Sequence, residues 1–173
     1  MSDATAIADR IARFRALMAE RAHDAAIVRD TASLRWLTGA ERVFDSERAH
    51  TAFITEDGLW LHTDARYFKT FIKRLGADGP WVLDQEPVDA AEWAAGKVAA
   101  SRARVVALED SVELAFHDDL LVECSKLSVM PLLPRMHADI ARLRIVKDNE
   151  ELALLRKAQA ITDEAFAHMR GFI

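Results

Sequence analysis

Thr51–Thr63 reads TAFITEDGLWLHT, and this stretch decides the fold class that the sequence predicts. Two runs of β-branched and aromatic residues flank Glu56-Asp57-Gly58, and Asp-Gly between such runs is a strong signal for a β-hairpin. Other apolar runs of strand length lie on both sides of the hairpin, at residues 24–29, 81–85, 105–110 and 127–130. Helical periodicity separates these runs, so the sequence predicts an α/β fold: a mixed, partly parallel sheet flanked by helices.

The helical segments are recognised by apolar residues at three- and four-residue spacing. They span residues 3–22, 31–37, 65–75, 88–101, 114–123 and 134–142. A last helix follows Asp148, which precedes Glu151 by three residues in a pattern close to a capping box. One face of this helix is apolar, so we expect it to pack against the preceding domain or against a partner outside the chain. We therefore divide the chain into an N-terminal α/β domain, residues 1–140, and a linker with the first helix of a further domain, residues 141–173.

The composition indicates a globular protein without nucleic-acid or membrane partners. The chain has 173 residues, of which 51% are apolar and 29% charged, and its formal net charge is −5. Its basic residues are dispersed, and its apolar runs are far shorter than the roughly 20 residues that cross a bilayer. The N-terminus does not read as a secretory signal, and Cys124, the one cysteine, excludes an internal disulfide. These features favour a cytoplasmic location.

The familiar catalytic motifs are absent from the sequence. It has no glycine-rich phosphate loop and no zinc signature. His62 and Asp64 stand two apart at a strand end, so they would point to the same side and could share a metal. We favour the alternative that His62 is a surface strand residue and that Asp64 caps the following helix. For Glu109 and Asp110, at another strand end, we favour capping or loop hydrogen bonding over a ligand site.

Residues 41–50 carry mixed charges without periodicity, so we expect an exposed loop. Within it, Arg42, Phe44 and Arg48 are the exposed set suited to touch a ligand or another subunit, with a solvated loop as the favoured alternative. Arg66 lies in the first turn of the helix after the hairpin, where it is free to pair with a carboxylate. We expect a structural role for Arg66 rather than a clamp on a substrate carboxylate.

Three segments together resemble one protein family. They are WLTG at 36–39, AFITEDGLWLHTDARYF at 52–68 and LRIVKDNEELALLRKAQAITDEAF at 143–166. In this order they resemble the proline peptidases with the pita-bread catalytic fold, which include Xaa-Pro aminopeptidase, prolidase and creatinase. The first two segments are similar to the N-terminal, creatinase-like domain, whose α/β layers resemble ribonuclease H. The third resembles the start of the catalytic domain.

The resemblance implies that this chain holds no catalytic residue and no metal ligand. In the family, two divalent metals (Mn, Co or Zn) are held by two Asp, one His and two Glu of the catalytic domain, which would lie beyond residue 173. The N-terminal domain would contact its own catalytic domain and a second subunit of a homodimer. The 41–50 loop would form a lip of the site for a proline-containing peptide, although its sequence ERVFDSERAH departs from the glycine- and serine-rich form common in the family. The candidate lip or interface residues are then Arg42, Phe44, Arg48 and Arg66.

The leading hypothesis is a non-catalytic N-terminal domain of a dinuclear Xaa-Pro metallopeptidase that serves oligomerisation and substrate access. One alternative is a protein-binding module derived from a peptidase-like protein that has lost catalysis. Another is a small α/β enzyme in which Asp64, Glu109 and Asp110 converge to bind Mg²⁺.

Overall fold

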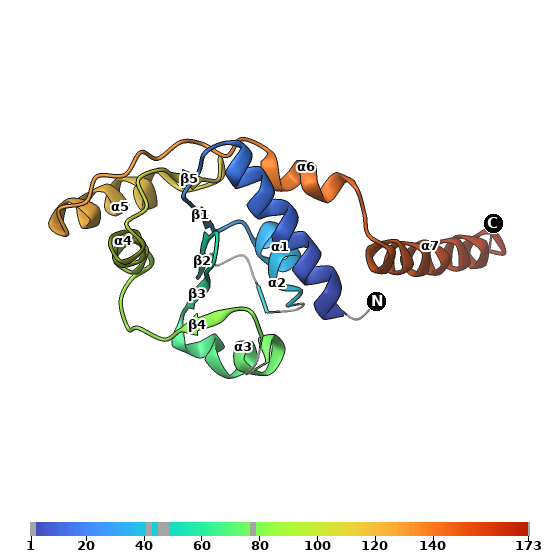
Figure 1. Cartoon of the computed structure of the whole chain (residues 1–173). Coiled ribbons are helices and arrows are strands. Elements are labelled where there is room, and N and C mark those ends of the chain that lie inside the picture. Colours follow the sequence, from blue (N-terminus) through green and yellow to red (C-terminus); the bar gives the residue numbers. More distant parts are fainter. Residues whose placement is uncertain (1–2, 41–42, 45–48, 77–78, 173) are drawn as a thin grey trace.

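A computed structural model describes residues 3–40, 43–44, 49–76 and 79–172 of the chain (Figure 1). In this part of the chain, one sheet contains five strands in the order β4-β3-β2-β1-β5. The strands are β1 (Ala25–Val28), β2 (His50–Thr55), β3 (Leu59–Thr63), β4 (Val82–Asp84) and β5 (Val106–Leu108). β2 is antiparallel to both of its neighbours, whereas the pairs β1–β5 and β3–β4 are parallel. The predicted mixed, partly parallel α/β sheet is confirmed.

Helices cover both faces of the sheet (Figure 1). They are α1 (Asp3–Glu20), α2 (Thr31–Thr38), the 3-10 turn η1 (Ala65–Tyr67), α3 (Phe68–Leu75), α4 (Ala90–Ser101), α5 (Leu114–Lys126), α6 (Asp139–Ile145) and α7 (Asn149–Arg170). One apolar cluster joins α1, α2, α3 and α6 to one face, and a second joins α4 and α5 to the other. β1 supplies both clusters, because alternate residues of a strand point to opposite faces: Ala26 and Val28 to the first, Ala25 and Ile27 to the second.

The predicted hairpin is the centre of the sheet. Phe53 of β2 lies opposite Trp60 of β3, and the Thr55 N–H donates to the Gly58 carbonyl across the turn (3.0 Å). The Thr55 hydroxyl donates to the Asp57 carboxylate (2.8 Å), as expected for an Asp-Gly turn. Arg15 of α1 donates to the Thr55 and Gly58 carbonyls (2.8 and 3.1 Å), so the turn is also held by the first helix.

The prediction of a strand at residues 127–130 is wrong. α5 extends to Lys126, and the chain pairs with β5 only later, through parallel bridges from Leu132 to Val105 and from Arg135 to Leu108. The Leu132 N–H donates to the Arg104 carbonyl (2.7 Å), which holds this segment in an extended conformation. The helix expected at 134–142 therefore begins five residues later, at Asp139.

Helix α7 is present as predicted, but it does not pack on the α/β body. Its N-cap is Asp148, and both reciprocal hydrogen bonds of a capping box with Glu151 are made. None of its residues is buried, and Figure 1 shows it projecting away from the sheet. Of the two arrangements expected for its apolar face, packing against the preceding domain is wrong for this structure.

Candidate functional site at the junction with helix α7

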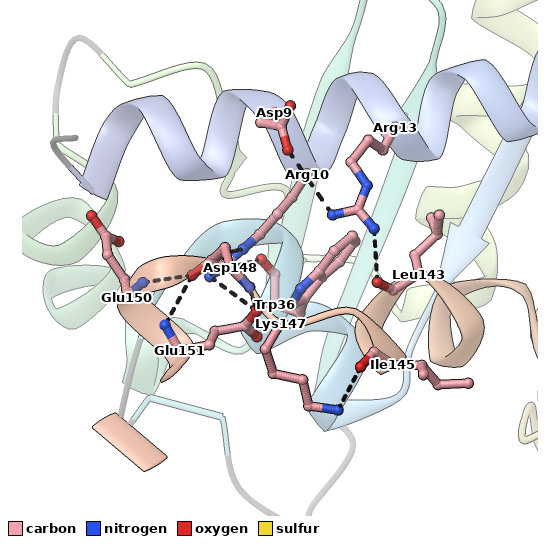
Figure 2. Close-up of polar contacts among 10 residues, drawn as sticks. All are labelled: Asp9, Arg10, Arg13, Trp36, Leu143, Ile145, Lys147, Asp148, Glu150 and Glu151. Atoms are coloured by element: carbon pink, nitrogen blue, oxygen red, sulfur yellow. Dashed lines mark hydrogen bonds and ion pairs between the residues drawn. The ribbon is translucent and has the colours of Figure 1, made fainter. Parts of the chain in front are cut away.

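Two arginines of α1 lie beside Trp36, and Arg10 points to the start of α7 whereas Arg13 points to α6 (Figure 2). Arg10 and Arg13 are three residues apart, so they lie on one side of α1, next to the apolar stripe that covers the sheet. Both guanidinium groups approach the indole of Trp36 in α2, with each central carbon 5.8 Å from the ring centroid. The indole is therefore a shared support that orients both charged groups.

Arg10 binds the residue that caps α7. Its Nε and Nη2 atoms donate to one carboxylate oxygen of Asp148, at 3.0 and 2.5 Å, and Nη1 donates to the Trp36 carbonyl at 3.2 Å. Glu151 adds a longer ion pair of 3.9 Å. The side chains of Arg10 and Asp148 are only 11% and 24% exposed, so this charge-assisted contact is shielded from water and salt.

Asp148 serves α7 and the α/β body at the same time. Its second carboxylate oxygen accepts the N–H groups of Glu150 and Glu151 (3.0 and 2.9 Å), and Glu151 accepts the Asp148 N–H in return (3.0 Å). Partial burial acts to raise the pKa of Asp148, but the Glu151 N–H and the Arg10 guanidinium outweigh it and hold this pKa below its usual value. The carboxylate is therefore charged, which suits both the helix N-terminus and Arg10.

The linker between α6 and α7 is fixed at both ends by α1. Arg13 donates from Nη2 to the Leu143 carbonyl (2.9 Å), and Arg10 holds Asp148 at the other end. Between these points Val146 is extended, and its side chain and that of Ile145 are exposed. The direction of α7 is therefore set by polar contacts and not by apolar packing.

A groove remains open between α7 and the α/β body. Its volume is about 740 Å³, and its wall includes Ile7, Arg10, Arg35, Trp36, Arg74, Arg144, Glu150, Glu151 and Leu154. Arg35 lies in α2, Arg74 at the end of α3 and Arg144 in α6, so three separate elements bring cations to it. A basic groove with an apolar strip is suited to bind a surface that carries carboxylates.

The acidic residues at the strand ends do not form a metal site. Glu109 accepts the N–H groups of Arg29 and Asp30, both at 2.7 Å, which confirms the predicted loop hydrogen bonding. Burial raises the pKa of Glu109 although these two N–H donors act against it. Asp110 pairs with Arg135 (2.9 Å), and Asp64 caps η1 as predicted. Across the described ranges, no three His, Cys, Asp or Glu residues are grouped to hold a metal, so the Mg²⁺ hypothesis is wrong.

Only part of the predicted lip is seen, because Arg42 and Arg48 lie outside the described residues. The expectation that Phe44 is exposed is wrong: it is 2% exposed, and its ring packs edge-on against His50 and Phe71, each 5.1 Å away. Arg66 is exposed, and its Nε donates to the Asp64 carboxylate (3.0 Å), which agrees with a structural role. A role of Arg66 in a lip or interface stays a prediction.

His62 is not the surface residue that the sequence suggested. It is buried, its ring stacks on Trp93 at 5.1 Å, and its Nε2 lies 3.2 Å from the Glu86 carbonyl. Helix α4 covers the face of β3 that carries His62. The alternation of residues within β3 shows which side chains share a face, but not whether a helix covers that face. Sequence reasoning also missed Arg10, Arg13 and Trp36, since the only local signal was a pair of arginines at the edge of an apolar stripe.

The sequence of this chain matches the model of one known domain family. The model of the creatinase/prolidase N-terminal domain matches residues 10–146. This chain belongs to the creatinase/prolidase N-terminal domain family. The matched range starts at Arg10 and ends two residues before Asp148, so the junction lies at the edge of the creatinase/prolidase N-terminal domain.

Solved structures share the fold at low sequence identity. An Xaa-Pro dipeptidase from Bacillus anthracis matches with a TM-score of 0.79 and 20% identity over 96% of this chain and 44% of that one. An Xaa-Pro aminopeptidase from Streptococcus pyogenes has a TM-score of 0.64 and 22% identity over 80% of this chain and 98% of that one. The N-terminal domain of the cytoplasmic peptidase PepQ from Mycobacterium tuberculosis H37Rv has a TM-score of 0.64 and 19% identity, over 78% and 98%.

This chain spans less than half of the length of the Xaa-Pro dipeptidase that it resembles. No curated protein matches the sequence significantly. Within the ranges that the structure describes, no helix combines the length and apolar character needed to cross a bilayer.

Proposed function

We propose that this chain is the non-catalytic N-terminal part of a metal-dependent Xaa-Pro aminopeptidase or dipeptidase. Its tasks are to orient the catalytic part, to contribute to assembly of the subunits and to shape the access of a proline-containing peptide. The observation that carries the proposal is the polar junction, in which α1 fixes the N-cap and first turn of a helix that packs on nothing else in the described structure.

Helix α7 supports the orienting role because its apolar side chains lack cover. Its large exposed apolar residues are Leu154, Leu155, Ile161, Phe166 and Met169. A row of this kind marks an interaction surface. In the proposal the catalytic part covers it, in keeping with an Xaa-Pro dipeptidase that shares the fold and is more than twice as long.

The proposed catalysis uses two divalent metals (Mn, Co or Zn) that residues outside this chain would hold. The described acidic and histidine side chains do not fit such a site, since they nowhere gather in threes, and Glu109 and Asp148 are committed to backbone N–H groups. In the proposal, this chain positions the catalytic part through its α/β body and its linker, and it supplies segment 41–50 as the lip of the site. The proposal includes a cytoplasmic location, in keeping with the cytoplasmic peptidase PepQ, whose N-terminal domain shares the fold.

A peptidase assay tests the non-catalytic role. The purified chain is incubated with Xaa-Pro dipeptides and Xaa-Pro-containing peptides in the presence of Mn²⁺, Co²⁺ or Zn²⁺, with a metal-only blank. We expect no turnover above the blank, because a hydrolytic water needs activation that this chain does not provide. Turnover that survives repurification would disprove the assignment.

The gene sequence after codon 173 tests the parent activity. The proposal expects a further domain with two Asp, one His and two Glu in the order of the pita-bread fold. A following domain without these residues would instead support the alternative, a protein-binding module that has lost catalysis.

A further inference from the structure

The extended chain between α5 and α6 forms the outer edge of the sheet beside β5 (Figure 1). Every second residue of this segment bonds inward to β5. The carbonyls of Leu132 and Pro134 accept the N–H groups of Val106 and Leu108, both at 2.9 Å. The Met136 N–H donates to the Leu108 carbonyl (2.7 Å). Because alternate residues of an extended strand point their backbone groups to opposite edges, the residues between these three face away from β5.

The outward-facing residues of this segment have open hydrogen-bonding groups. Among the residues that the structure describes, none bonds to the backbone N–H or carbonyl of Leu133 and Arg135, or to the carbonyl of Pro131. The N–H that Pro134 lacks would face β5, so this proline does not protect the outer edge. Leu132 is 69% exposed and the Arg135 side chain 68% exposed, so side chains do not cover the edge either. A strand edge of this kind is a template for one further strand.

We propose that this edge, residues 131–135, binds an extended segment of another protein as an added antiparallel strand. In antiparallel pairing, one residue of the partner exchanges both backbone hydrogen bonds with Leu133, and a second does the same with Arg135. A third donates its N–H to the Pro131 carbonyl. The partner residues between them place their side chains on the sheet face that carries Leu132. The partner is therefore a protein with an exposed extended stretch that has apolar residues at every second position.

The proposed contact goes beyond the orienting role and does not use α7. Figure 1 shows the segment along the outside of the body, whereas α7 projects from a different side. Both surfaces can therefore be occupied at the same time. A peptide that pairs with five residues should bind with a dissociation constant of about 0.1–1 mM, because the net gain from each hydrogen bond is small.

A titration of the isotope-labelled chain with a synthetic peptide, followed by amide NMR spectra, tests the inference. The peptide is acetyl-Lys-Thr-Val-Thr-Val-Thr-Lys-amide, in which the central threonine is to pair with Leu133 and the two valines are to lie on the Leu132 side. A second peptide is N-methylated at the central threonine and loses the donor that faces the edge. The matched control is N-methylated at one valine, whose N–H points away from the edge.

Two substitutions at one exposed position test the protein side of the contact. Arg135→Pro removes the outward N–H, whereas Arg135→Ala keeps it. Both variants lose the ion pair with Asp110, so the comparison isolates the backbone donor. The amide spectra also show whether each variant is folded.

We expect shifts that are largest at residues 131–136. N-methylation of the central threonine should weaken binding at least about tenfold, and N-methylation of the valine less than about twofold. Arg135→Pro should weaken binding at least about threefold, and Arg135→Ala less than about twofold.

Three outcomes would overturn the inference. One is the absence of shifts at the edge up to about 5 mM peptide. Another is an equal loss from the two N-methylated peptides, which would exclude strand pairing even if Arg135→Pro failed to fold. The third is self-association of the chain that Arg135→Pro abolishes, which would assign the edge to a second copy instead of another protein. The proposed orienting role of the chain does not depend on any of these results.

Discussion

Replacing Asp148 with Ala should unfold much of α7 without weakening the α/β body. α7 contributes 22 of the 88 α-helical residues in the described part of the chain, and none of the 22 is buried. A helix of this length without tertiary packing is only marginally stable in water, because nucleation is costly. The Asp148 cap and its contact with Arg10 supply a fixed first turn, so α7 should depend on them strongly.

The size of the effect follows from two separate losses. Removing an N-cap that accepts two N–H groups costs about 1 kcal/mol, and removing a hydrogen-bonded ion pair that is mostly shielded costs about 1.5–3 kcal/mol. Together they approach about 3 kcal/mol, a factor of roughly 100 in the statistical weight of the nucleated helix. Complete loss of α7 would remove a quarter of the helical signal at 222 nm.

Two further variants separate the cap from the ion pair. Asp148→Asn keeps a good N-cap but loses the charge, and Arg10→Met keeps the stem over Trp36 but loses the donors. Both should reduce the ellipticity at 222 nm less than Asp148→Ala, and combining them should add little, because they remove the same contact. The midpoint of thermal unfolding, followed by tryptophan fluorescence, should stay unchanged, since the tryptophans report on the body. Ellipticity of Asp148→Ala within about 5% of wild type would refute the reasoning.

Other substitutions probe the body and the effect of pH. Glu109→Ala should lower the free energy of unfolding in urea by about 2–5 kcal/mol, because two buried N–H groups lose their acceptor. The matched control Asp110→Ala, at an exposed position, should lower it by under about 1 kcal/mol. Equal effects would contradict the role of Glu109. The pKa of Glu109 is raised on folding, so the stabilisation linked to this shift is present at low pH and is lost as the pH rises through the folded pKa. Glu109→Gln cannot titrate and should therefore remove this fall in the free energy of unfolding. Gly39→Ala should destabilise the fold by about 1–3 kcal/mol, because Gly39 ends α2 at φ +66° and an added Cβ would meet Ile7. Gly96→Ala should stabilise the fold by up to about 1 kcal/mol, because Gly96 lies within α4 and faces open space. Effects of the same sign would be inconsistent with these two conformations. The pKa of Asp148 is lowered on folding, so the helicity of α7 should fall as the pH drops below about 4, and a pH-independent signal between about pH 2 and 6 would count against the ion pair.

Features that depend on neighbours in sequence were predicted well. The hairpin at 51–63 and the cap at Asp148 each need only a few consecutive residues, and both are present in the structure. The strand expected at 127–130 failed for the opposite reason. Whether a short apolar run becomes a strand depends on an available edge, and β5 pairs instead with residues 132 and 135, after the chain has left α5.

Burial of individual polar and aromatic residues was the weaker part of the prediction. The charged surroundings of Phe44 suggested an exposed loop, but contacts with His50 at the start of β2 and with Phe71 of α3 bury it. His62 likewise lies against Trp93, which is 31 residues away in sequence. The junction shows the same limit, because Arg10 and Asp148 are separated by 138 residues. Sequence patterns identify a cap, but they do not reveal which distant cation will bind it.

The body and the junction of this chain are held by different forces. Apolar burial fixes the sheet and its two helical layers, so the body should fold whatever happens at residue 148. The direction of α7 depends on a few charged hydrogen bonds whose strength varies with pH and with the substitution of one side chain. Because different interactions hold the body and α7, the direction of α7 relative to the sheet can change during evolution without loss of the apolar core. If the proposed catalytic part follows α7, the polar linker is where we expect differences between relatives in its placement to arise.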